Sequence, residues 1–334
     1  MCIRDRSTTL SVRPGWHAPG PLEVHHLASE LRFERDGFKA SDTSSEERYG
    51  ASVSLRDNVN LDMRGTTLIV VPGVRFDWTD EAGSHVLPSL GAVIEPISWL
   101  RIKANVDRSF RNPSFYDLHL PDRGFISGNR ELDPERALNY DVGVELAFDS
   151  PSVVHNVRVA ASVFRSEIKD SIVWLRVSPF KVRPENTDDA TAEGLEVSLS
   201  FDVGSYLSVY ANHTETRATL DPDNTRLPGR PNRQTDVRLE LGRQGVVRAV
   251  AEYQHTGSIS VSTGGTYTLA SRNSWNASLA LELGAVSKRM GLDLGTRRLW
   301  LHAALENIAD VAIRDSLSFP QPGRSLRFGV EAEW

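Results

Sequence analysis

The chain has 334 residues, a formal net charge of -6 and a hydrophobic content of 40%. This negative balance argues against a broad surface for nucleic acid, because phosphate binding requires an excess of lysine and arginine. The sequence holds no run of about 18 apolar residues, so no transmembrane helix is expected. Strands that cross a membrane hide their hydrophobicity in alternation, so these numbers suit one large β-barrel as well as two ordinary domains.

The N-terminal stretch, residues 1–6, matches the translation of a common sequencing-adapter end. We therefore interpret residues 1–6 as an artefact, take residues 7–334 as the folding region and expect the natural protein to extend further upstream. The only cysteine, Cys2, lies in this stretch. The remaining sequence thus predicts neither a disulfide nor cysteine–metal chemistry.

Hydrophobic and polar residues alternate in segment after segment along the chain. In the last ten residues, Leu326, Phe328 and Val330 share one face with Trp334. The same period of two recurs in residues 100–107, 140–148, 195–201, 275–283 and 299–306. Because successive side chains of a strand point to opposite faces, this period predicts half-buried strands, and counting them gives roughly 14.

The polar faces of these segments carry charges. Arg101 and Lys103 mark the polar face of an early segment, and those of later segments carry Glu196, Glu282 and Glu331. We predict that all these faces point into one lumen, since an outer-membrane barrel is apolar outside and polar inside. A soluble all-β binding module, with its polar faces in water, is the alternative.

The connections between the segments differ in length in a regular way. Short ones are expected at 95–98, 149–152, 202–205 and 243–245. Long ones are expected at 111–136, 178–192, 217–233 and 257–272, with 284–296 as a misfit that should be short. Short turns on one rim and long loops on the other are typical of outer-membrane barrels, whereas a soluble sandwich has no reason to sort its loops in this way.

Aromatic residues stand near the expected strand ends, at Trp78, Trp99, Trp174, Tyr206, Tyr253, Trp275 and Trp334. They are candidates for the two aromatic girdles that mark the membrane interfaces. The competing explanation is the general preference of aromatic residues for strands.

Seven short motifs follow one another from residue 71 to the C-terminal region. They read VPGVRFD from 71, SFRNPSF from 109, GNRELDPE from 128, N…A…GLE from 186, LPGRP from 227, ENIAD from 306 and PGR from 322. Their characteristic residues are Phe110, Arg111, Pro113, Gly128, Asn129, Leu132, Pro134, Glu135, Gly194, Glu196, Arg230, Pro231, Asn307, Pro322, Gly323 and Arg324. In this order, the motifs resemble those of the C-terminal barrel of TonB-dependent receptors.

The resemblance implies an all-β fold, an antiparallel transmembrane β-barrel in the bacterial cell outer membrane. Such barrels have about 22 strands and a plugged lumen, so the roughly 14 strands imply a partial barrel, with the plug domain absent from this chain. It also implies TonB-dependent uptake of a bulky, scarce nutrient, first a ferric siderophore and second cobalamin. The TonB system would act through the missing N-terminal region, and the barrel itself would hold no cofactor and do no covalent chemistry.

The last strand carries a second resemblance. Family members, like most bacterial outer-membrane barrels, end in an aromatic residue on the lipid-facing side, usually Phe. Here Phe328, Val330 and Trp334 form that side, which implies contact with outer-membrane lipid and recognition by the barrel-assembly machinery. The alternative function is a passive or structural barrel, such as a porin or an autotransporter translocator, and the motif series counts against it.

Three polar motif residues, Arg111, Asn129 and Glu135, are candidate ligand contacts. We expect them instead to order the long loop 111–136 against the barrel rim. The prolines in the two motifs support this interpretation, because each fixes its own backbone angle and biases the preceding residue towards extended geometry.

The sequence predicts no metal site and no catalytic site. His25 and His26 are adjacent, so in a strand they point to opposite faces and suit a chelating pair poorly. Asp221, Asp223 and Asn224 lack the glycine and glutamate that follow in an EF-hand loop. A nucleophile elbow, a metal-ligand pair and a phosphate loop are all missing, so we expect that the protein is not an enzyme.

Overall fold

Strands account for about three quarters of the chain that the computed structural model describes. The described residues are 3–12, 15–17, 25–40, 45–149, 152–187, 189–221, 224–243, 246–262, 267–284, 287, 291, 298–316 and 319–333. None of the helices in these segments is long and apolar enough to cross a membrane. The chain divides into two compact units: unit 1 comprises residues 1–143, 163–193 and 218–225, and unit 2 comprises residues 144–162, 194–217 and 226–334.

Within the described residues, 17 strands are hydrogen-bonded into one antiparallel sheet, more than the roughly 14 predicted. The difference has simple causes. β1 (Ile3–Val12) includes residues that the adapter interpretation set aside, and β2 (Gly15–His17) and β14 (Thr225–Arg226) are too short to show alternation. Four strands contribute residues to both units: β8 (Glu135–Phe148), β9 (Val154–Lys169), β12 (Ala190–Val203) and β13 (Leu207–Leu220).

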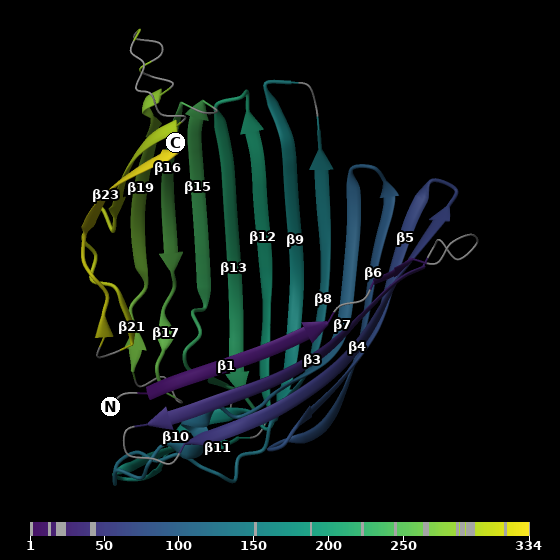
Figure 1. The fold of residues 1–334 in the computed structure, drawn as a ribbon, viewed down its shortest axis with the longest axis vertical. Helices are drawn as coiled ribbons and strands as arrows, with labels where there is room; N and C mark the ends of the chain where they lie inside the picture. The colour runs from purple at the N-terminus through teal and green to yellow at the C-terminus, as the bar shows by residue number, and fades with distance from the viewer. Residues whose placement is uncertain are drawn as a thin grey trace. The chain divides into compact units, whose positions relative to one another are not determined.

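In unit 1, consecutive strands pair from β3 to β7 (Figure 1). Both β1 and β2 pair with β3. The bounds are β3 (His25–Ala40), β4 (Glu46–Met63), β5 (Thr66–Thr79), β6 (Gly83–Ile97) and β7 (Leu100–Arg111). Tight turns hold these pairs in register. Arg64 and Gly65 join β4 to β5 with φ angles of 54° and 92°, which match the right-handed twist of the strands.

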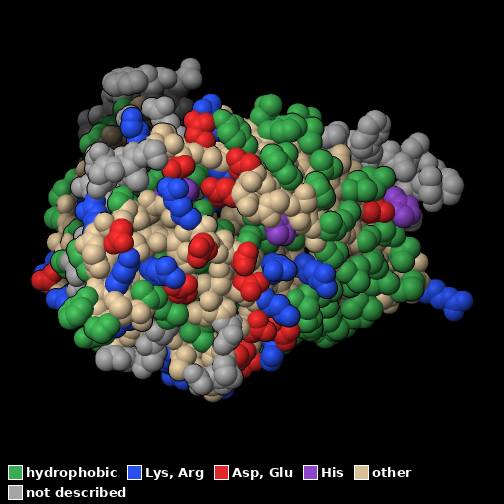
Figure 2. All heavy atoms as spheres, turned by 90° about the horizontal axis from the view of Figure 1, so that it is seen from below, with side chains coloured by type: hydrophobic (Ala, Val, Ile, Leu, Met, Phe, Trp, Pro, Cys, Tyr) green, Lys and Arg blue, Asp and Glu red, His purple; other side chains and the backbone are tan. Residues whose placement is uncertain are grey.

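One face of the unit 1 strands is apolar and exposed. The register places Val53 opposite Phe76 and Phe76 opposite Val86. These three side chains are 52%, 45% and 61% exposed. Figure 2 shows a continuous hydrophobic area at the right of the view, over β4–β6. An exposed apolar surface of this extent is typical of contact with a membrane or with another protein.

The opposite face of the same strands is polar. Arg75 Nε donates to Asp77 Oδ1 at 2.7 Å, and Arg101 Nε donates to Glu95 Oε1 at 2.5 Å. Lys103 lies two residues beyond Arg101 along β7 and therefore on the same face. The alternation predicted for this strand is confirmed.

Unit 2 repeats the pattern in five strands that pair in order: β15 (Arg233–Arg243), β16 (Val247–Thr256), β19 (Arg272–Glu282), β20 (Arg298–Glu306) and β23 (Ser325–Glu333). On its apolar face, Leu279 is 40% exposed and Val330 is 70% exposed. On its polar face, Glu282 lies opposite Trp300, and Trp300 lies opposite Glu331. The prediction that Glu282 and Glu331 share the polar face is therefore confirmed.

The sorting of connections by length is confirmed from β7 onward. Short turns follow β8, β12 and β15, and long segments follow β7, β13, β16 and β20. The long connection expected at 178–192 is itself a hairpin of β10 (Ile172–Ser178) and β11 (Lys181–Asn186). In unit 2, Figure 1 places the short turns at the top and the strands β17 (Ile259–Ser260) and β21 (Arg314–Ser316) at the bottom. The misfit at 284–296 connects β19 to β20 and lies largely outside the described residues.

The aromatic residues divide into two groups. Trp78 and Trp275 lie on the apolar faces, 42% and 50% exposed, and the Trp275 ring lies 4.6 Å from that of Tyr253. Trp174 does not fit a girdle, because its indole Nε1 donates to Asp117 Oδ1 at 2.9 Å and holds the loop beneath it. Trp334 lies outside the described residues.

Candidate functional site

The long connection after β7 folds around a short helix, α1 (Phe115–His119). Five residues are too few to be stable alone, so the helix depends on its cap and on packing. Ser114 Oγ accepts from the Asp117 backbone N–H at 3.1 Å, and Asp117 Oδ2 accepts from the Ser114 backbone N–H at 3.1 Å. This capping box satisfies two donors of the first turn. Asp117 also holds Trp174, so the cap links α1 to the hairpin β10–β11.

Side chains from β3 and β4 anchor α1 to the strand ends. The Phe115 ring stacks on Phe38 at 5.9 Å, and Phe38 is only 2% exposed. Arg48 lies 4.7 Å above the Phe115 ring and donates from Nη2 to the Pro113 carbonyl at 2.7 Å. Arg48 Nε also donates to Glu81 Oε2 at 2.6 Å. The Arg48 guanidinium contacts the Phe115 ring, the Pro113 carbonyl and the Glu81 carboxylate at once. These three contacts fix the position of α1 relative to β4.

Residues of the GNRELDPE motif pack against α1 and bind β11. Gly128 approaches the helix so closely that a Cβ there would lie 2.7 Å from the Leu118 carbonyl oxygen, so the position requires glycine. Asn129 is 8% exposed, and its Nδ2 donates to the Pro184 carbonyl at 3.0 Å. Its Oδ1 accepts from the Glu131 backbone N–H at 3.1 Å. Asn129 thus ties the loop to β11.

Arg111 and Glu135 stand at the two ends of the connection between β7 and β8 and form an ion pair with each other. Arg111 Nε donates to Glu135 Oε2 at 2.6 Å, and Glu135 Oε1 accepts from the Ile172 backbone N–H at 2.7 Å. Leu132 and Pro134 are half-buried beside this pair. We call α1, residues 120–134 and the hairpin β10–β11 the loop network.

An ion pair between β11 and the connection after α1 holds the outer part of the loop network together. Lys181 Nζ lies 2.7 Å from Asp122 Oδ2, and the Gly124 backbone N–H donates to Asp122 Oδ1 at 2.9 Å. The Lys181 ammonium first, and the Gly124 amide second, hold the pKa of the Asp122 carboxyl below its ordinary value.

The later motifs meet in unit 2. Asn307 is 5% exposed with a positive φ of 49°, and its side chain pairs with both backbone groups of Val311 at 2.8 and 2.9 Å. Asp310 Oδ1 accepts from the Arg324 backbone N–H at 2.8 Å, and a Cβ on Gly323 would lie 2.7 Å from that same oxygen. The ENIAD and PGR motifs therefore form one compact turn.

The remaining motif residues lie apart from these two clusters. Pro231 bridges to Ile259 beside the exposed Arg230. In β12, Gly194 is half-buried and Glu196 is exposed. Pro322 lines the loop-side pocket described below. Phe110 stacks on the His85 ring at 4.1 Å. The structure does not gather all motif residues into one site.

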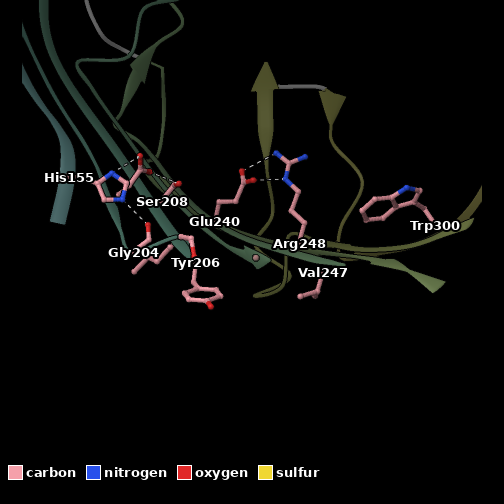
Figure 3. A pocket seen from close by; sticks show the side chains of 12 residues that line it. His155, Gly204, Tyr206, Ser208, Glu240, Val247, Arg248 and Trp300 are labelled. Atoms are coloured by element: carbon pink, nitrogen blue, oxygen red, sulfur yellow. Dashed lines mark hydrogen bonds and ion pairs between the residues drawn. The ribbon is translucent and has the colours of Figure 1, made fainter. Parts of the chain in front are cut away.

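At the end of unit 2 that carries the short turns, the polar face is hollowed (Figure 3). We call this hollow, lined by His155, Asp202, Ser208, Glu240, Arg248 and Trp300 among others, the turn-side pocket. Arg248 binds Glu240 through two nitrogens at 2.6 and 2.9 Å. Ser208 Oγ donates to Asp202 Oδ1 at 2.6 Å. Its charged groups already have partners, so this pocket offers little to a ligand.

A second hollow lies on the same face, beside the long connections of unit 2. We call it the loop-side pocket; its floor is made by β16, β19, β20 and β23, and residues of the segment 307–323 cover part of it. Glu252, Asn276 and Ser278 belong to the floor, and Ile313 and Gln321 to the cover. Among the described residues, the side-chain amide nitrogens of Gln254 and Asn276 and the hydroxyl of Ser278 in its floor have no hydrogen-bond partner.

Sequence reasoning missed the partners that hold the motifs. The capping box of Ser114 and Asp117 is readable from the sequence, but Phe38 and Arg48 give no local signal. Among the described residues, no group of three or more histidine, cysteine, aspartate or glutamate side chains is arranged to hold a metal ion. His25 pairs with Asp57 at 2.6 Å.

Comparison with known proteins adds three findings. The family model described as "TonB dependent receptor-like, beta-barrel" matches residues 9–298. The vitamin B12 transporter BtuB of Vibrio vulnificus is 32% identical over 132 residues, which are 39% of this chain and 20% of that protein. The probable TonB-dependent siderophore receptor PirA of Acinetobacter baumannii is 26% identical over 204 residues, 51% of this chain and 26% of that protein.

Solved structures agree at the level of the fold. The ferric enterobactin receptor PfeA of Pseudomonas aeruginosa, in a mutant crystallised with enterobactin, superimposes with a TM-score of 0.73 at 18% identity. The superposition covers 98% of this chain and 54% of that receptor. The chain therefore spans about half the length of this solved receptor.

Proposed function

Because this chain belongs to the family of TonB-dependent receptor β-barrels, we propose that it forms part of the wall of a transporter that takes up a bulky, scarce nutrient across the bacterial outer membrane. The proposed substrate is a ferric siderophore, with cobalamin as the second candidate. Relatives named for each of these substrates support the pair. The family and its relatives are receptors and transporters, not enzymes.

The observation that carries this proposal is the two-faced sheet. Its apolar face exposes large side chains such as Phe76 and Val330, and its polar face carries paired charges such as Arg101 and Glu95. A lipid environment makes the first face favourable, and a wet or protein-filled lumen suits the second. In this proposal, the TonB system supplies the energy for uptake.

The motif residues serve the loops in this proposal. Asn129 and Glu135 keep the loop network on the rim, so the loop tips present a fixed surface to substrate. At the C-terminal strand, Phe328 and Val330, 77% and 70% exposed, contact lipid and belong to the signal read by the barrel-assembly machinery. Trp334 completes that signal.

An uptake assay tests the proposal. The complete natural gene that contains this sequence is expressed in a bacterium that lacks its own siderophore and cobalamin receptors, with and without an intact TonB system. We expect accumulation of labelled ferric siderophore or labelled cobalamin only when TonB and the proton gradient are present. Equal accumulation without TonB would identify a passive barrel, and no accumulation of either substrate would contradict the transport function.

A further inference from the structure

We propose that the loop-side pocket binds an uncharged part of the substrate that carries amide or hydroxyl groups, and that it disfavours polyanions. This inference rests on the proposed transport function. The pocket lies beside the long connections of unit 2, which in outer-membrane barrels face the outside, so a substrate from the medium meets it early.

The strand register builds the floor of the pocket from one polar face. Gln254 lies opposite Ser274, Glu252 opposite Asn276, and Val250 opposite Ser278. These neighbouring pairs stand side by side along β16 and β19. In the next two strands, Ala304 lies opposite Arg327. A floor made by strand side chains is rigid, which keeps its polar groups in place before a ligand arrives.

The cover of the pocket is held by the compact turn of the ENIAD and PGR motifs. The Asn307 backbone N–H donates to Asn276 Oδ1 at 2.9 Å, which fastens the cover to the floor. The Gln321 backbone N–H donates to the Ile313 carbonyl at 2.8 Å and closes the cover on itself. The pocket therefore exists without a ligand and needs little ordering to bind one.

Unengaged donors of the floor define the ligand chemistry. Gln254 Oε1 accepts from Ser274 Oγ at 3.5 Å, and Asn276 Oδ1 accepts from the Asn307 backbone N–H. The Gln254 Nε2 and Asn276 Nδ2 groups have no hydrogen-bond partner within the described part of the chain. The Ser278 hydroxyl is exposed and has no partner among the residues that the structure describes. Three neutral groups on adjacent strands suit carbonyl, amide and hydroxyl groups of a ligand.

Charge in the pocket is already compensated. Glu306 Oε2 accepts from Arg327 Nη2 at 2.6 Å, and Glu252 Oε1 accepts from Arg238 Nη1 at 3.3 Å. Two carboxylates and one guanidinium line the pocket, so the lining offers a polyanion no uncompensated cation. A polyanion would lose water here without gaining an ionic partner.

Two classes of substrate carry the neutral carbonyl, amide or hydroxyl groups that this pocket would bind. In a ferric trihydroxamate, three monoanionic groups neutralise the ferric ion, so the complex is uncharged and rich in carbonyl oxygens. Cobalamin carries amide side chains around its ring. A ferric tricatecholate, by contrast, is a trianion. The pocket predicts preference for either of the first two over the third.

Binding measurements with the full chain in detergent micelles test the proposal. The three probes are a ferric trihydroxamate, cyanocobalamin and a ferric tricatecholate, each titrated by isothermal calorimetry. The main variant combines Gln254→Met and Ser278→Ala, which removes two donors at nearly constant volume. The control is Ser200→Ala, a serine of β12 outside the pocket. A second variant, Ser278→Lys, adds a cation, and heat-modifiable migration in gels confirms the fold of each.

We expect one of the two neutral probes to bind, and the double variant to weaken that binding roughly tenfold, as the loss of two neutral hydrogen bonds implies. The control should bind as the wild type does, and Ser278→Lys should improve binding of the tricatecholate. The proposal is overturned if neither neutral probe binds, if only the tricatecholate binds, or if the double variant keeps wild-type affinity.

Uptake separates this proposal from the transport function. TonB-dependent uptake that the double variant leaves unchanged would overturn the pocket and leave the transport function standing. Pocket-dependent binding without any TonB-dependent uptake would contradict the transport function and leave the pocket standing.

Discussion

Asn129→Ala is expected to release the loop network while the strands remain folded. The substitution removes the amide that donates to the Pro184 carbonyl at 3.0 Å and accepts from the Glu131 backbone N–H at 3.1 Å. Asn129 is 8% exposed and Pro184 is fully buried, so water does not replace these partners readily. The orphaned Pro184 carbonyl is buried and costs about 1–3 kcal/mol, so local opening becomes easier by about that amount, or roughly 5- to 150-fold.

Hydrogen exchange of the full chain in detergent measures this effect. Peptides from residues 112–134 and 172–186 should exchange faster in the variant, and peptides from β4–β6 should not change. The matched control is Asn212→Ala in β13, because the Asn212 side chain has no partner among the described residues. Unchanged protection at 112–134 would refute the role assigned to Asn129, and a uniform loss over all strands would show that the loop network is no separate unit.

Three further predictions concern the two faces, the assembly signal and pH. Leu279→Arg on the apolar face should cost about 2–4 kcal/mol and lower the yield of heat-modifiable chain, whereas Ala280→Arg on the polar face should be tolerated; equal yields would contradict the two-faced sheet. Trp334→Ala should reduce the folded chain in outer-membrane fractions without changing which substrate binds; normal levels would remove Trp334 from the assembly signal. Because the pKa of Asp122 is depressed below 3.8, its ion pair persists above that value and is lost as pH falls through the lowered pKa; exchange at residues 120–127 should accelerate only in that acidic range.

The parts of the fold that follow local rules were predictable from the sequence. Alternation identified the strands that carry Arg101, Glu282 and Glu331, because a period of two directly reports the pleat. The lengths of the connections from β7 onward were predictable because the alternating segments mark where each strand begins and ends. β2 escaped prediction because three residues show no period, and Trp174 was assigned to a girdle because its partner Asp117 is 57 residues away in sequence.

The sequence by itself determined the family, the all-β class and the side of each strand that carries charge, since each depends on motif order or on spacing within a few residues. Only the tertiary structure decided that Phe38 and Arg48 seat α1, and that Asn307 and Gly323 cover a pocket floored by Gln254. These contacts join residues tens of positions apart. The cost of closing such loops grows only slowly with length, so spacing along the chain does not indicate which distant residues meet.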